Sequence, residues 1–322
     1  MLEKKLPLVS ITVPSYNQGR FIKETMDSIL SQDYASIEIL VMDGGSKDDT
    51  LEVLGRYAGD SRIKVKSERD KGQADAINKG FAESKGDIIA WLNSDDTYLP
   101  GVLAKQVGFL LANPEIDLVY GDAVYTKVDG TRCGTYFARP FSHSELCRLC
   151  FIPQPSVFMR RQVYERNGPL DLSLHFALDY EYWLRAMFHS RFAYNPGFVA
   201  TYRLHEESKT VGGATNFNPE VERAVVRALN DQAAPDALKK DRENLLADLY
   251  LGLGNSCLRA ANRKDAKANL RKSISHRTFR PRLFWFISYY LLGVPATNAL
   301  AQQWTRWRSR RGHMELGAAD IR

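Results

Sequence analysis

The sequence predicts an α/β protein with a mostly parallel, Rossmann-like sheet flanked by helices, followed by a helical C-terminal region. Strand and helix patterns alternate through about the first hundred residues, and a polar cluster follows each strand pattern. The Gly- and Asn-rich stretch 212–218 predicts a linker, because only helical patterns follow it. We therefore expect an α/β domain over 1–211 and a basic, helical region over 212–322.

Each expected element rests on a short apolar run or on apolar residues at helical spacing. In the first part the expected order is strand 8–14, helix 20–31, strand 37–42, a helix from Ser46, strand 62–67, helix 72–84 and strand 87–92. The later expected elements are helix 101–112, strand 117–120, a hairpin over 124–135, helix 142–150, strand 156–159, helix 178–190, strands 192–194 and 198–204, and helices 245–261 and 264–274. Ser46 and Asp49 form the pattern of a capping box, and Asp129-Gly130 marks the hairpin turn.

The 322-residue chain carries a net charge of +6, and its positive excess is concentrated near the end. Between residues 259 and 311 the only acid is Asp265, which indicates an anionic partner for this tail. Aromatic residues interleave with arginines over 280–311, a mixture typical of a segment in a lipid headgroup layer. We therefore expect an anionic membrane surface as the partner rather than nucleic acid. A core helix with a solvated basic edge is the alternative.

The chain shows no pattern of insertion into a membrane. Residues 1–7 lack the apolar stretch of a signal peptide, and the apolar run 283–294 is shorter than the roughly 20 residues that a span requires. The four cysteines are too few for a disulfide framework, and Cys147 and Cys150 lack the partners of a zinc site. We expect a cytoplasmic protein, held peripherally on the inner face of the cytoplasmic membrane.

Polar clusters follow four predicted strands, at the positions where an open parallel sheet binds its ligands. The clusters are Pro14-Ser15-Tyr16-Asn17, Asp43-Gly44-Gly45-Ser46, Glu68-Arg69-Asp70-Lys71-Gly72 and Asn93-Ser94-Asp95-Asp96. Any one of them is equally well explained as a turn or a helix cap. Their repetition brings carboxylates from separate segments to one edge and predicts a ligand site there.

No phosphate-binding loop accompanies these clusters, since the sequence lacks GxxxxGK[ST] and no GxGxxG follows the first strand. A nucleotide bound at this edge therefore needs a metal ion to offset its diphosphate charge. The cluster 93–96 supplies the oxygen ligands that Mg²⁺ and Mn²⁺ prefer. The sequence predicts a site for Mg²⁺ or Mn²⁺.

The ordered set of stretches 13–17, 43–50, 70–72 with 78–80, and 91–96 resembles the serial motifs of family 2 glycosyltransferases with the GT-A fold. The resemblance extends over about residues 7–210. It implies an inverting enzyme that moves one sugar from a UDP-, dTDP- or GDP-linked donor to a hydroxyl of a saccharide acceptor. Together with the basic tail, it suggests a lipid-linked acceptor in bacterial surface-polysaccharide biosynthesis.

The resemblance also implies roles for individual residues. The implied nucleotide-binding set is Pro14, Tyr16, Asn17, Asp43, Asp70, Gly72 and Ser94. Asp95 matches the metal-binding aspartate, and His205 matches a histidine that approaches the metal and the diphosphate. Asn93 stands where the family often has another aspartate, which removes one negative charge from the metal site.

The segment 177–185 resembles the part of the family that carries the catalytic base, and Asp179 falls at that position. A carboxylate suits this role, because the attacking hydroxyl must lose its proton. The apolar neighbour Leu178 would raise the pKa of Asp179 by desolvation, and a helix cap is the alternative role. Gln154 matches an acceptor-side glutamine, and Asn93 and Asp96 are secondary candidates for the same site.

Other interpretations compete with this one. A sugar-phosphate nucleotidyltransferase would need a Gly-rich, basic first loop, which residues 15–18 do not supply. Asn93 and Leu178 suggest a non-catalytic nucleotide-sugar-binding or scaffold protein instead. Residues 303–307 spell the QxxRW of processive polysaccharide synthases, but they lie far beyond Asp179 with no spanning helix nearby. We therefore expect a non-processive hexosyltransferase.

Overall fold

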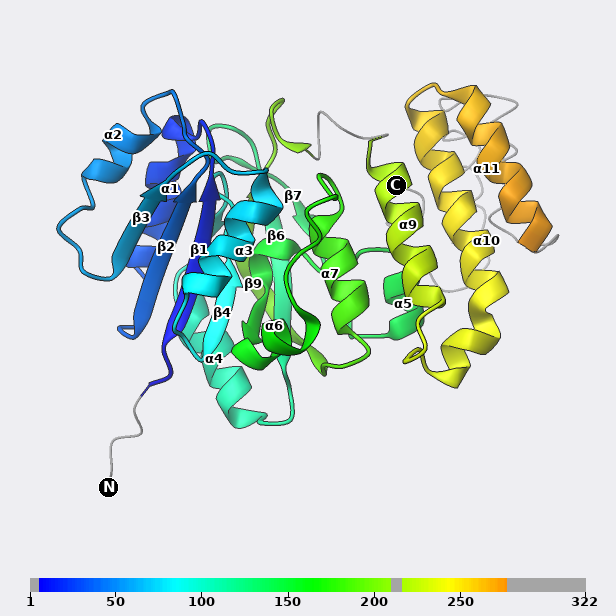
Figure 1. Cartoon of the computed structure of the whole chain (residues 1–322), viewed down its shortest axis with the longest axis horizontal. Helices are drawn as coiled ribbons and strands as arrows, with labels where there is room; N and C mark the ends of the chain where they lie inside the picture. The colour runs from blue at the N-terminus through cyan, green and yellow to red at the C-terminus, as the bar shows by residue number, and fades with distance from the viewer. Residues whose placement is uncertain (1–5, 210–215, 277–322) are drawn as a thin grey trace, which may run out of the picture. The chain divides into compact units, whose positions relative to one another are not determined.

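The computed structural model describes residues 6–209 and 216–276, which fall into two compact units (Figure 1). One unit contains residues 6–209 with 223–235, and the other contains 216–222 with 236–276. The expected domain boundary between residues 211 and 212 stays a prediction. The aromatic, basic tail 280–322 and its QxxRW motif lie outside the described residues.

The first unit is built on one 9-stranded sheet. Its strands are β1 (Val9–Ser15), β2 (Ile37–Asp43), β3 (Ile63–Ser67), β4 (Ile88–Trp91), β5 (Thr97–Tyr98), β6 (Leu118–Thr126), β7 (Arg132–Tyr136), β8 (Phe158–Arg160) and β9 (Phe192–Arg203). They follow the order β3-β2-β1-β4-β8-β6-β9-β5, with β7 paired to β6. Strands β1 to β4 are mutually parallel where they pair, and β6 is parallel to β9. The predicted α/β class is confirmed.

Strands β1, β2 and β3 end side by side. Ser15 is in register with Asp43, and Asp43 is in register with Ser67. Strand β4 runs parallel to β1 up to the pair of Thr12 and Trp91, so its carboxyl end points the same way. We call this side of the sheet the carboxyl edge. It gathers the loops that carry the predicted ligand clusters.

Helices cover both faces of the sheet. They are α1 (Gly19–Leu30), α2 (Thr50–Gly55), α3 (Gln73–Glu83), α4 (Val102–Ala112), α5 (His143–Arg148), α6 (Arg161–Asn167) and α7 (Leu178–Ala186), with a 3-10 turn η1 (Gln154–Ser156). In Figure 1, α3 lies in front of β1 and β2 and α1 lies behind them. Helix α1 buries Phe21, Ile22, Met26 and Ile29, which helical spacing places on its sheet-facing side.

The structure corrects the expected start of the second helix. Helix α2 begins at Thr50, and its N-cap residue Asp49 makes no side-chain capping bond. Ser46 instead donates to Asp43 and accepts a hydrogen bond from Asn17. The predicted capping box of Ser46 and Asp49 is therefore wrong, because contacts within the carboxyl edge engage the serine hydroxyl.

Other element boundaries also differ from the expectations. Strand 117–120 and the first arm of the hairpin form one strand, β6, and the pieces 192–194 and 198–204 form one strand, β9. Register shifts around Asp122 and the positive φ of Gly197 account for the interrupted sequence pattern. The sequence patterns predict neither α6 nor the short β5. Cys150 lies beyond the end of α5, so it does not share a helix face with Cys147.

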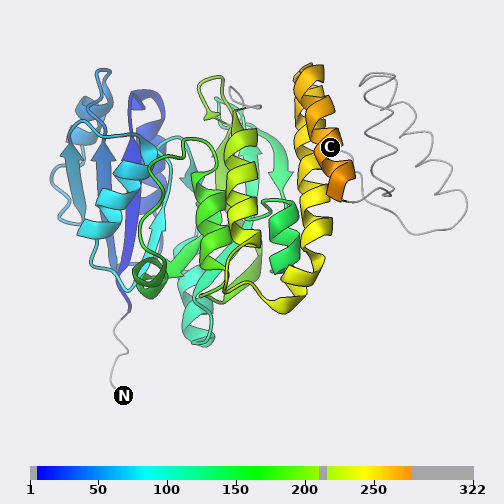
Figure 2. The same ribbon diagram turned by 45° about the vertical axis from the view of Figure 1, so that its right-hand side comes forward.

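The second unit contains the expected C-terminal helix pair. Helix α9 (Phe217–Leu229) belongs to this unit up to residue 222, so the end of the predicted linker is helical. Helices α10 (Asp236–Arg259) and α11 (Arg263–His276) pack side by side in both views (Figure 2). Leu251, Cys257, Leu258 and Ala266 form their apolar contact. No helix among the described residues is long and apolar enough to cross a membrane.

Gly80 allows α3 to approach β1 closely. A Cβ added at Gly80 would lie 2.3 Å from Thr12 Cγ2, and Thr12 is fully buried. We expect Gly80→Ala to destabilise the protein by about 1–3 kcal/mol, because an overpacked core must shift. Gly108 on α4 is the matched control, since nothing lies within 4 Å of its added Cβ. Gly108→Ala should stabilise by up to about 1 kcal/mol. Urea unfolding measures both changes, and equal midpoints for the two variants would contradict this packing.

Candidate active site

The loops after β1 and β2 are joined by hydrogen bonds at the carboxyl edge. Asn17 donates its backbone N–H to Ser46 Oγ at 2.7 Å, and its Oδ1 accepts from Lys47 N at 2.9 Å. The φ of Asn17 is 53°, a left-handed conformation that asparagine adopts more readily than most residues. Asp48 Oδ2 accepts from Gly19 N at 3.0 Å, where α1 begins. Asn17 thus fixes the shape of the edge, and its contact with a nucleotide stays a prediction.

The Asp43 carboxylate is buried beneath these loops and accepts hydrogen bonds on both oxygens. Oδ2 accepts from the backbone N–H groups of Gly45 and Ser46 and from Ser67 Oγ at 2.6 Å. Oδ1 accepts from Ser46 Oγ at 2.5 Å. Each carboxylate oxygen has about two acceptor sites, so Oδ1 keeps one for a donor such as a base N–H. Asp43 is therefore pre-oriented by its own loop.

Asp70 lies against the loop after β2. Its Oδ1 accepts from Gly72 N at 2.8 Å, and the φ of Gly72 is 107°, a conformation that favours glycine. A Cβ added at Gly44 would lie 2.8 Å from Asp70 Oδ2, so glycine at 44 lets the two loops meet. Asp43 and Asp70 both line a small cavity of about 10 Å³. The structure brings these predicted residues together.

Pro14, Ser94 and Tyr16 lie at different depths of the carboxyl edge. Pro14 is buried in β1, in register with Met42, and Ser94 is buried directly after β4. Tyr16 exposes 55% of its surface. An exposed aromatic ring can stack on a planar group such as a nucleotide base. Of these three residues, Tyr16 has the side chain that a ligand reaches most directly.

Asp95 and His205 meet at the end of β4. His205 Nε2 lies 3.0 Å from Asp95 Oδ2, and the Phe21 ring packs against the imidazole with 4.9 Å between centroids. The described residues contain no cluster of three or more His, Cys, Asp or Glu side chains suited to a metal. Mg²⁺ typically takes only one or two carboxylates and completes its shell with water and substrate phosphates, and imidazole suits Mn²⁺ less than it suits zinc. Asp95 and His205 would supply two ligands to an ion that took the rest from water and phosphate, and this role stays a prediction.

Asp96 is buried, whereas Asn93 is partly exposed and engaged by a neighbouring side chain. Asp96 is 2% exposed, and its Oδ1 accepts from Arg203 N at 2.9 Å. Burial, reinforced by the charge of Asp95, raises the pKa of Asp96 well above its usual range. Asn93 Oδ1 accepts from Gln73 Nε2 at 2.7 Å. These partners make Asn93 and Asp96 supports of the loop that presents Asp95.

Arg203 is a further site residue, which the motifs do not single out. Its side chain is 3% exposed and donates to the carbonyls of Asp95 and Val128 at 2.9 and 2.7 Å. It also pairs with Glu24 and packs over the Phe21 ring. Arg203 therefore ties the Asp95 loop to α1 and to the β6–β7 turn. The sequence contained a signal for this residue. Arg203 lies near the end of an expected strand, just before His205, and an arginine at a buried position usually has a charged or polar partner.

Asp179 lies in the first turn of α7, and its role as the catalytic base stays a prediction. Its Oδ1 accepts from Tyr180 N at 2.8 Å, and the N–H of Asp179 itself also favours the charged carboxylate. The residue keeps partial solvent exposure although protein atoms surround its carboxyl group. Desolvation is the largest effect on its pKa and raises it, while the N–H donors and Lys209 oppose that rise. Asp179 is both reachable and a stronger base than an ordinary carboxylate.

Tyrosines and a cysteine form a wall beside Asp179. Tyr136 donates its hydroxyl to the Cys150 carbonyl at 2.5 Å, and burial followed by the Asp179 charge raises the pKa of the Cys150 thiol. The Tyr125 ring stacks on Tyr136 with 5.8 Å between centroids and meets Tyr202 edge-on at 5.7 Å. Burial raises the pKa of the Cys150 thiol and of the Tyr136 and Tyr125 phenols, which favours their neutral forms.

A chain of hydrogen bonds joins the Asp95 loop to the segment that leads into α7. Lys209 Nζ donates to Gln73 Oε1 at 2.7 Å and to the His175 carbonyl at 2.6 Å. Gln73 in turn holds Asn93. These hydrogen bonds connect the Asp95 loop to the segment that leads to Asp179, and a shared site for the two aspartates stays a prediction.

Gln154 lies beneath this site. It is 5% exposed and donates through Nε2 to the Trp91 carbonyl at 2.8 Å. Its buried Oε1 accepts no hydrogen bond from the described residues. The structure thus places Gln154 behind β4, and its contact with an acceptor stays a prediction.

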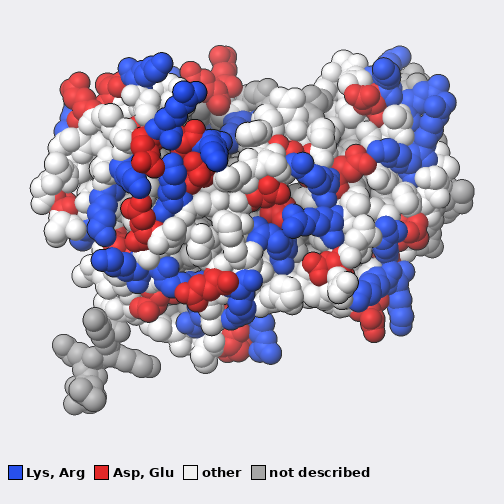
Figure 3. Space-filling view, viewed as in Figure 1, with Lys and Arg blue, Asp and Glu red and all other residues white. Residues whose placement is uncertain are grey.

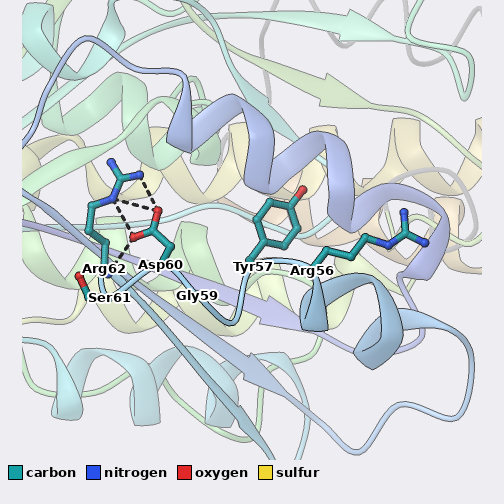
Figure 4. Close-up of a pocket in the computed structure, with 6 residues that line it drawn as sticks. All are labelled: Arg56, Tyr57, Gly59, Asp60, Ser61 and Arg62. Carbon is teal, nitrogen blue, oxygen red and sulfur yellow. Dashed lines mark hydrogen bonds and ion pairs between the residues drawn. The ribbon is translucent and has the colours of Figure 1, made fainter.

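A shallow depression of about 570 Å³ lies away from the carboxyl edge, at the amino end of β3 (Figure 4). Arg62 pairs there with both carboxyl oxygens of Asp60. The Tyr57 hydroxyl donates to Asp27 on α1 at 2.7 Å. These polar groups form hydrogen bonds with other protein side chains, and no predicted site residue lines the depression. The predicted site residues lie at the carboxyl edge instead.

Comparison with known proteins identifies the family of the chain. Residues 10–168 match the family model described as Glycosyl transferase family 2. An uncharacterised glycosyltransferase of Rickettsia typhi is 30% identical over 233 residues, which cover 67% of this chain and 70% of the relative. A PGL/p-HBAD biosynthesis glycosyltransferase of Mycobacterium tuberculosis is 28% identical over 202 residues, or 61% of this chain and 73% of the relative.

Solved structures show the same fold. S. aureus TarS 1-349 in complex with UDP-GlcNAc has a TM-score of 0.61 at 17% identity, covering 84% of this chain and 91% of that one. The mannosyltransferase PcManGT from Pyrobaculum calidifontis, in complex with GDP-Man and Mn²⁺, has a TM-score of 0.62 at 21% identity, covering 92% and 88%. The fold is GT-A, and the chain belongs to glycosyltransferase family 2.

Proposed function

We propose that this glycosyltransferase moves one sugar, with inversion, from a nucleotide-diphosphate donor to a hydroxyl of a saccharide acceptor. The observation that supports the proposal is that hydrogen bonds through Gln73 and Lys209 connect the loop of Asp95, which pairs with His205, to the segment that leads to Asp179. An inverting displacement requires a base on one side of the anomeric carbon and a stabilised diphosphate on the other.

Asp179 is the residue that we assign as the base. Its Oδ2 takes the proton of the acceptor hydroxyl while the hydroxyl oxygen forms a bond to the anomeric carbon. The bond from that carbon to the diphosphate oxygen breaks in the same displacement, and the nucleoside diphosphate leaves with the electron pair. The raised pKa of Asp179 favours this proton transfer.

The donor that we propose is a UDP-, dTDP- or GDP-linked hexose. The TarS complex contains UDP-GlcNAc and the PcManGT complex contains GDP-Man and Mn²⁺, which supports a donor of this class. Asp43, Asp70 and the Tyr16 ring would bind the nucleoside, and Asp95 with His205 would hold Mg²⁺ or Mn²⁺. When bound, such an ion stabilises the negative charge that develops on the leaving diphosphate.

The acceptor that we propose is a lipid-linked saccharide of surface-polysaccharide assembly, met at the inner face of the cytoplasmic membrane. Helix α11 exposes Arg263, Lys264, Lys267 and Arg271, and Figure 3 shows lysine and arginine side chains gathered over this helix. Each such cation near an anionic bilayer contributes about 1 kcal/mol of attraction. These charges, together with the basic tail, support a peripheral membrane address.

A donor panel tests the proposed function. The purified protein is incubated with UDP-, dTDP- and GDP-hexoses, Mn²⁺ or EDTA, and lipid-linked saccharides in anionic vesicles. We expect release of nucleoside diphosphate from one donor class, a product one hexose longer by mass spectrometry, and an inverted anomeric signal by NMR. EDTA should lower the rate at least about tenfold, because the leaving charge loses its metal. A retained anomer, a ladder of products or no transfer from any donor would refute the proposal.

A further inference from the structure

Lys209 is a cationic side chain whose hydrogen bonds connect α3, which supports the Asp95 loop, to the segment that leads into α7. Its Nζ donates to Gln73 Oε1 at 2.7 Å and to the His175 carbonyl at 2.6 Å. Gln73 begins α3 and donates to Asn93 Oδ1 at 2.7 Å, two residues before Asp95. His175 lies four residues before Asp179. The ammonium group is therefore anchored toward both the proposed metal ligand and the proposed base.

The ammonium charge also reaches Asp179 electrostatically. Desolvation raises the pKa of Asp179, and the Lys209 charge is among the effects that oppose this rise. The anchor at His175, four residues before Asp179, agrees with that interaction. In a displacement at the anomeric carbon, the region around the base and the metal residues contains the bond that breaks and the phosphate that leaves.

We infer that Lys209 is a binding residue for the donor diphosphate, acting beside the metal that Asp95 and His205 would hold. This inference rests on the proposed function. Asn93 contributes no negative charge to the loop, and Gln73 connects that same asparagine to Lys209. The site thus combines a reduced acidic ligand set with a positioned ammonium group. Charge-assisted hydrogen bonds from lysine to phosphate oxygens are short and strong.

The alternative is that Lys209 has a purely structural role, in which it connects the segment after β9 to α3. Loss of a structural contact would weaken the affinity of the site for every ligand to the same extent. A diphosphate-binding role affects nucleoside diphosphates more than the matching monophosphates, because the monophosphate lacks the outer phosphate group. The ratio of the two affinities therefore separates the roles, and it requires no turnover, acceptor or metal.

The test measures dissociation constants for UDP, UMP, GDP and GMP by isothermal titration calorimetry, in EDTA and again in Mn²⁺. The variants are Lys209→Met, Lys209→Arg and the matched control Lys105→Met. Lys105 is an exposed lysine that also donates to a backbone carbonyl, that of Pro196 at 2.7 Å, but it lies on α4 outside the site. Every variant is compared with the wild type by its thermal midpoint.

For the nucleotide that wild type binds, we expect Lys209→Met to reduce the preference for diphosphate over monophosphate about tenfold in EDTA. Lys209→Arg should keep most of the preference, and Lys105→Met should keep all of it. Equal weakening of both nucleotides in Lys209→Met, or no weakening, would overturn the inference and leave the proposed function standing. Failure of wild type to bind any of the four nucleotides would overturn both.

Discussion

Asp179→Asn is expected to lower kcat by about 10²–10⁴-fold, because an amide cannot take the proton of the acceptor hydroxyl. The substitution keeps the shape of the side chain and the hydrogen bond from Tyr180 N to Oδ1. Substrate binding should therefore change little. The rate is measured as nucleoside diphosphate release under saturating donor and acceptor. A rate within about threefold of wild type would remove Asp179 from the role of base.

The same variant should be at least as stable as wild type at neutral pH. Desolvation raises the pKa of Asp179 in the folded state, so its favourable, protonated form is fully present at low pH. That contribution is lost as pH rises through the raised pKa. The substituted amide would carry no buried charge, so the thermal midpoint of Asp179→Asn should equal or exceed that of wild type.

Asp60→Asn is the matched control. Its hydrogen bonds with Arg62, on the surface far from the carboxyl edge, lower the pKa of Asp60 to about 2. A lowered pKa means that the charged form favours folding, so this substitution should lower the thermal midpoint slightly and leave kcat unchanged. Opposite effects of the two Asp-to-Asn changes on stability and rate would exclude unfolding as the cause of lost activity.

The pH profile follows from the same residue. The base acts only when ionised, so kcat/KM should fall on the acid side through a pKa higher than that of an ordinary aspartate. The charged or titratable groups that face Asp179 are Cys150, Tyr136 and Lys209. Burial raises the pKa of both the thiol and the phenol, so neither ionises in the range where Asp179 does.

Asp95→Ala has the second large expected effect. It removes the carboxylate that faces His205 and that would hold the metal, so we expect kcat/KM to fall at least about a hundredfold with Mn²⁺ present. The half-saturating Mn²⁺ concentration should rise as well, which separates lost metal binding from lost folding. The measurement is a Mn²⁺ titration of the transfer rate. An unchanged titration curve would show that Asp95 binds no metal.

Asp96→Asn is the control for this loop. Asp96 already tends toward its protonated form, because it is buried and lies beside Asp95. Its Oδ1 accepts from Arg203 N, and an amide oxygen can accept the same bond. The Mn²⁺ dependence of Asp96→Asn should therefore stay close to that of wild type, although the two aspartates are neighbours in sequence.

The carboxyl edge could be predicted from the sequence because it depends on patterns within short stretches of the chain. Apolar runs of strand length each end in polar residues, and parallel pairing brings those ends together at one side of a sheet. Asp43 and Asp70 therefore meet as expected. The place of Asp179 came from resemblance to a family, since no spacing in the chain connects α7 with β4.

Other parts of the site could not be predicted from local patterns. Whether Asp96 points inward or outward depends on Arg203, whose backbone N–H binds it from a distant strand. Whether Ser46 caps a helix depends on Asn17, which offers it a tertiary partner. Gln154 was expected on the acceptor side, and its burial follows from its contact with the Trp91 carbonyl of β4. Each of these outcomes is set by tertiary contacts.

The end of β9 and the residues after it make contacts that can form only late in folding. Arg203, His205 and Lys209 contact residues that lie 107, 110 and 136 positions earlier in the chain. Closing such long loops costs entropy that only nearly complete packing repays. A chain emerging from the ribosome can pair β1 to β4 early, but the contacts of the Asp95 loop with Arg203 and His205 form only after residue 205 has emerged. Completion of the carboxyl edge is thus a later step of folding than the pairing of its strands.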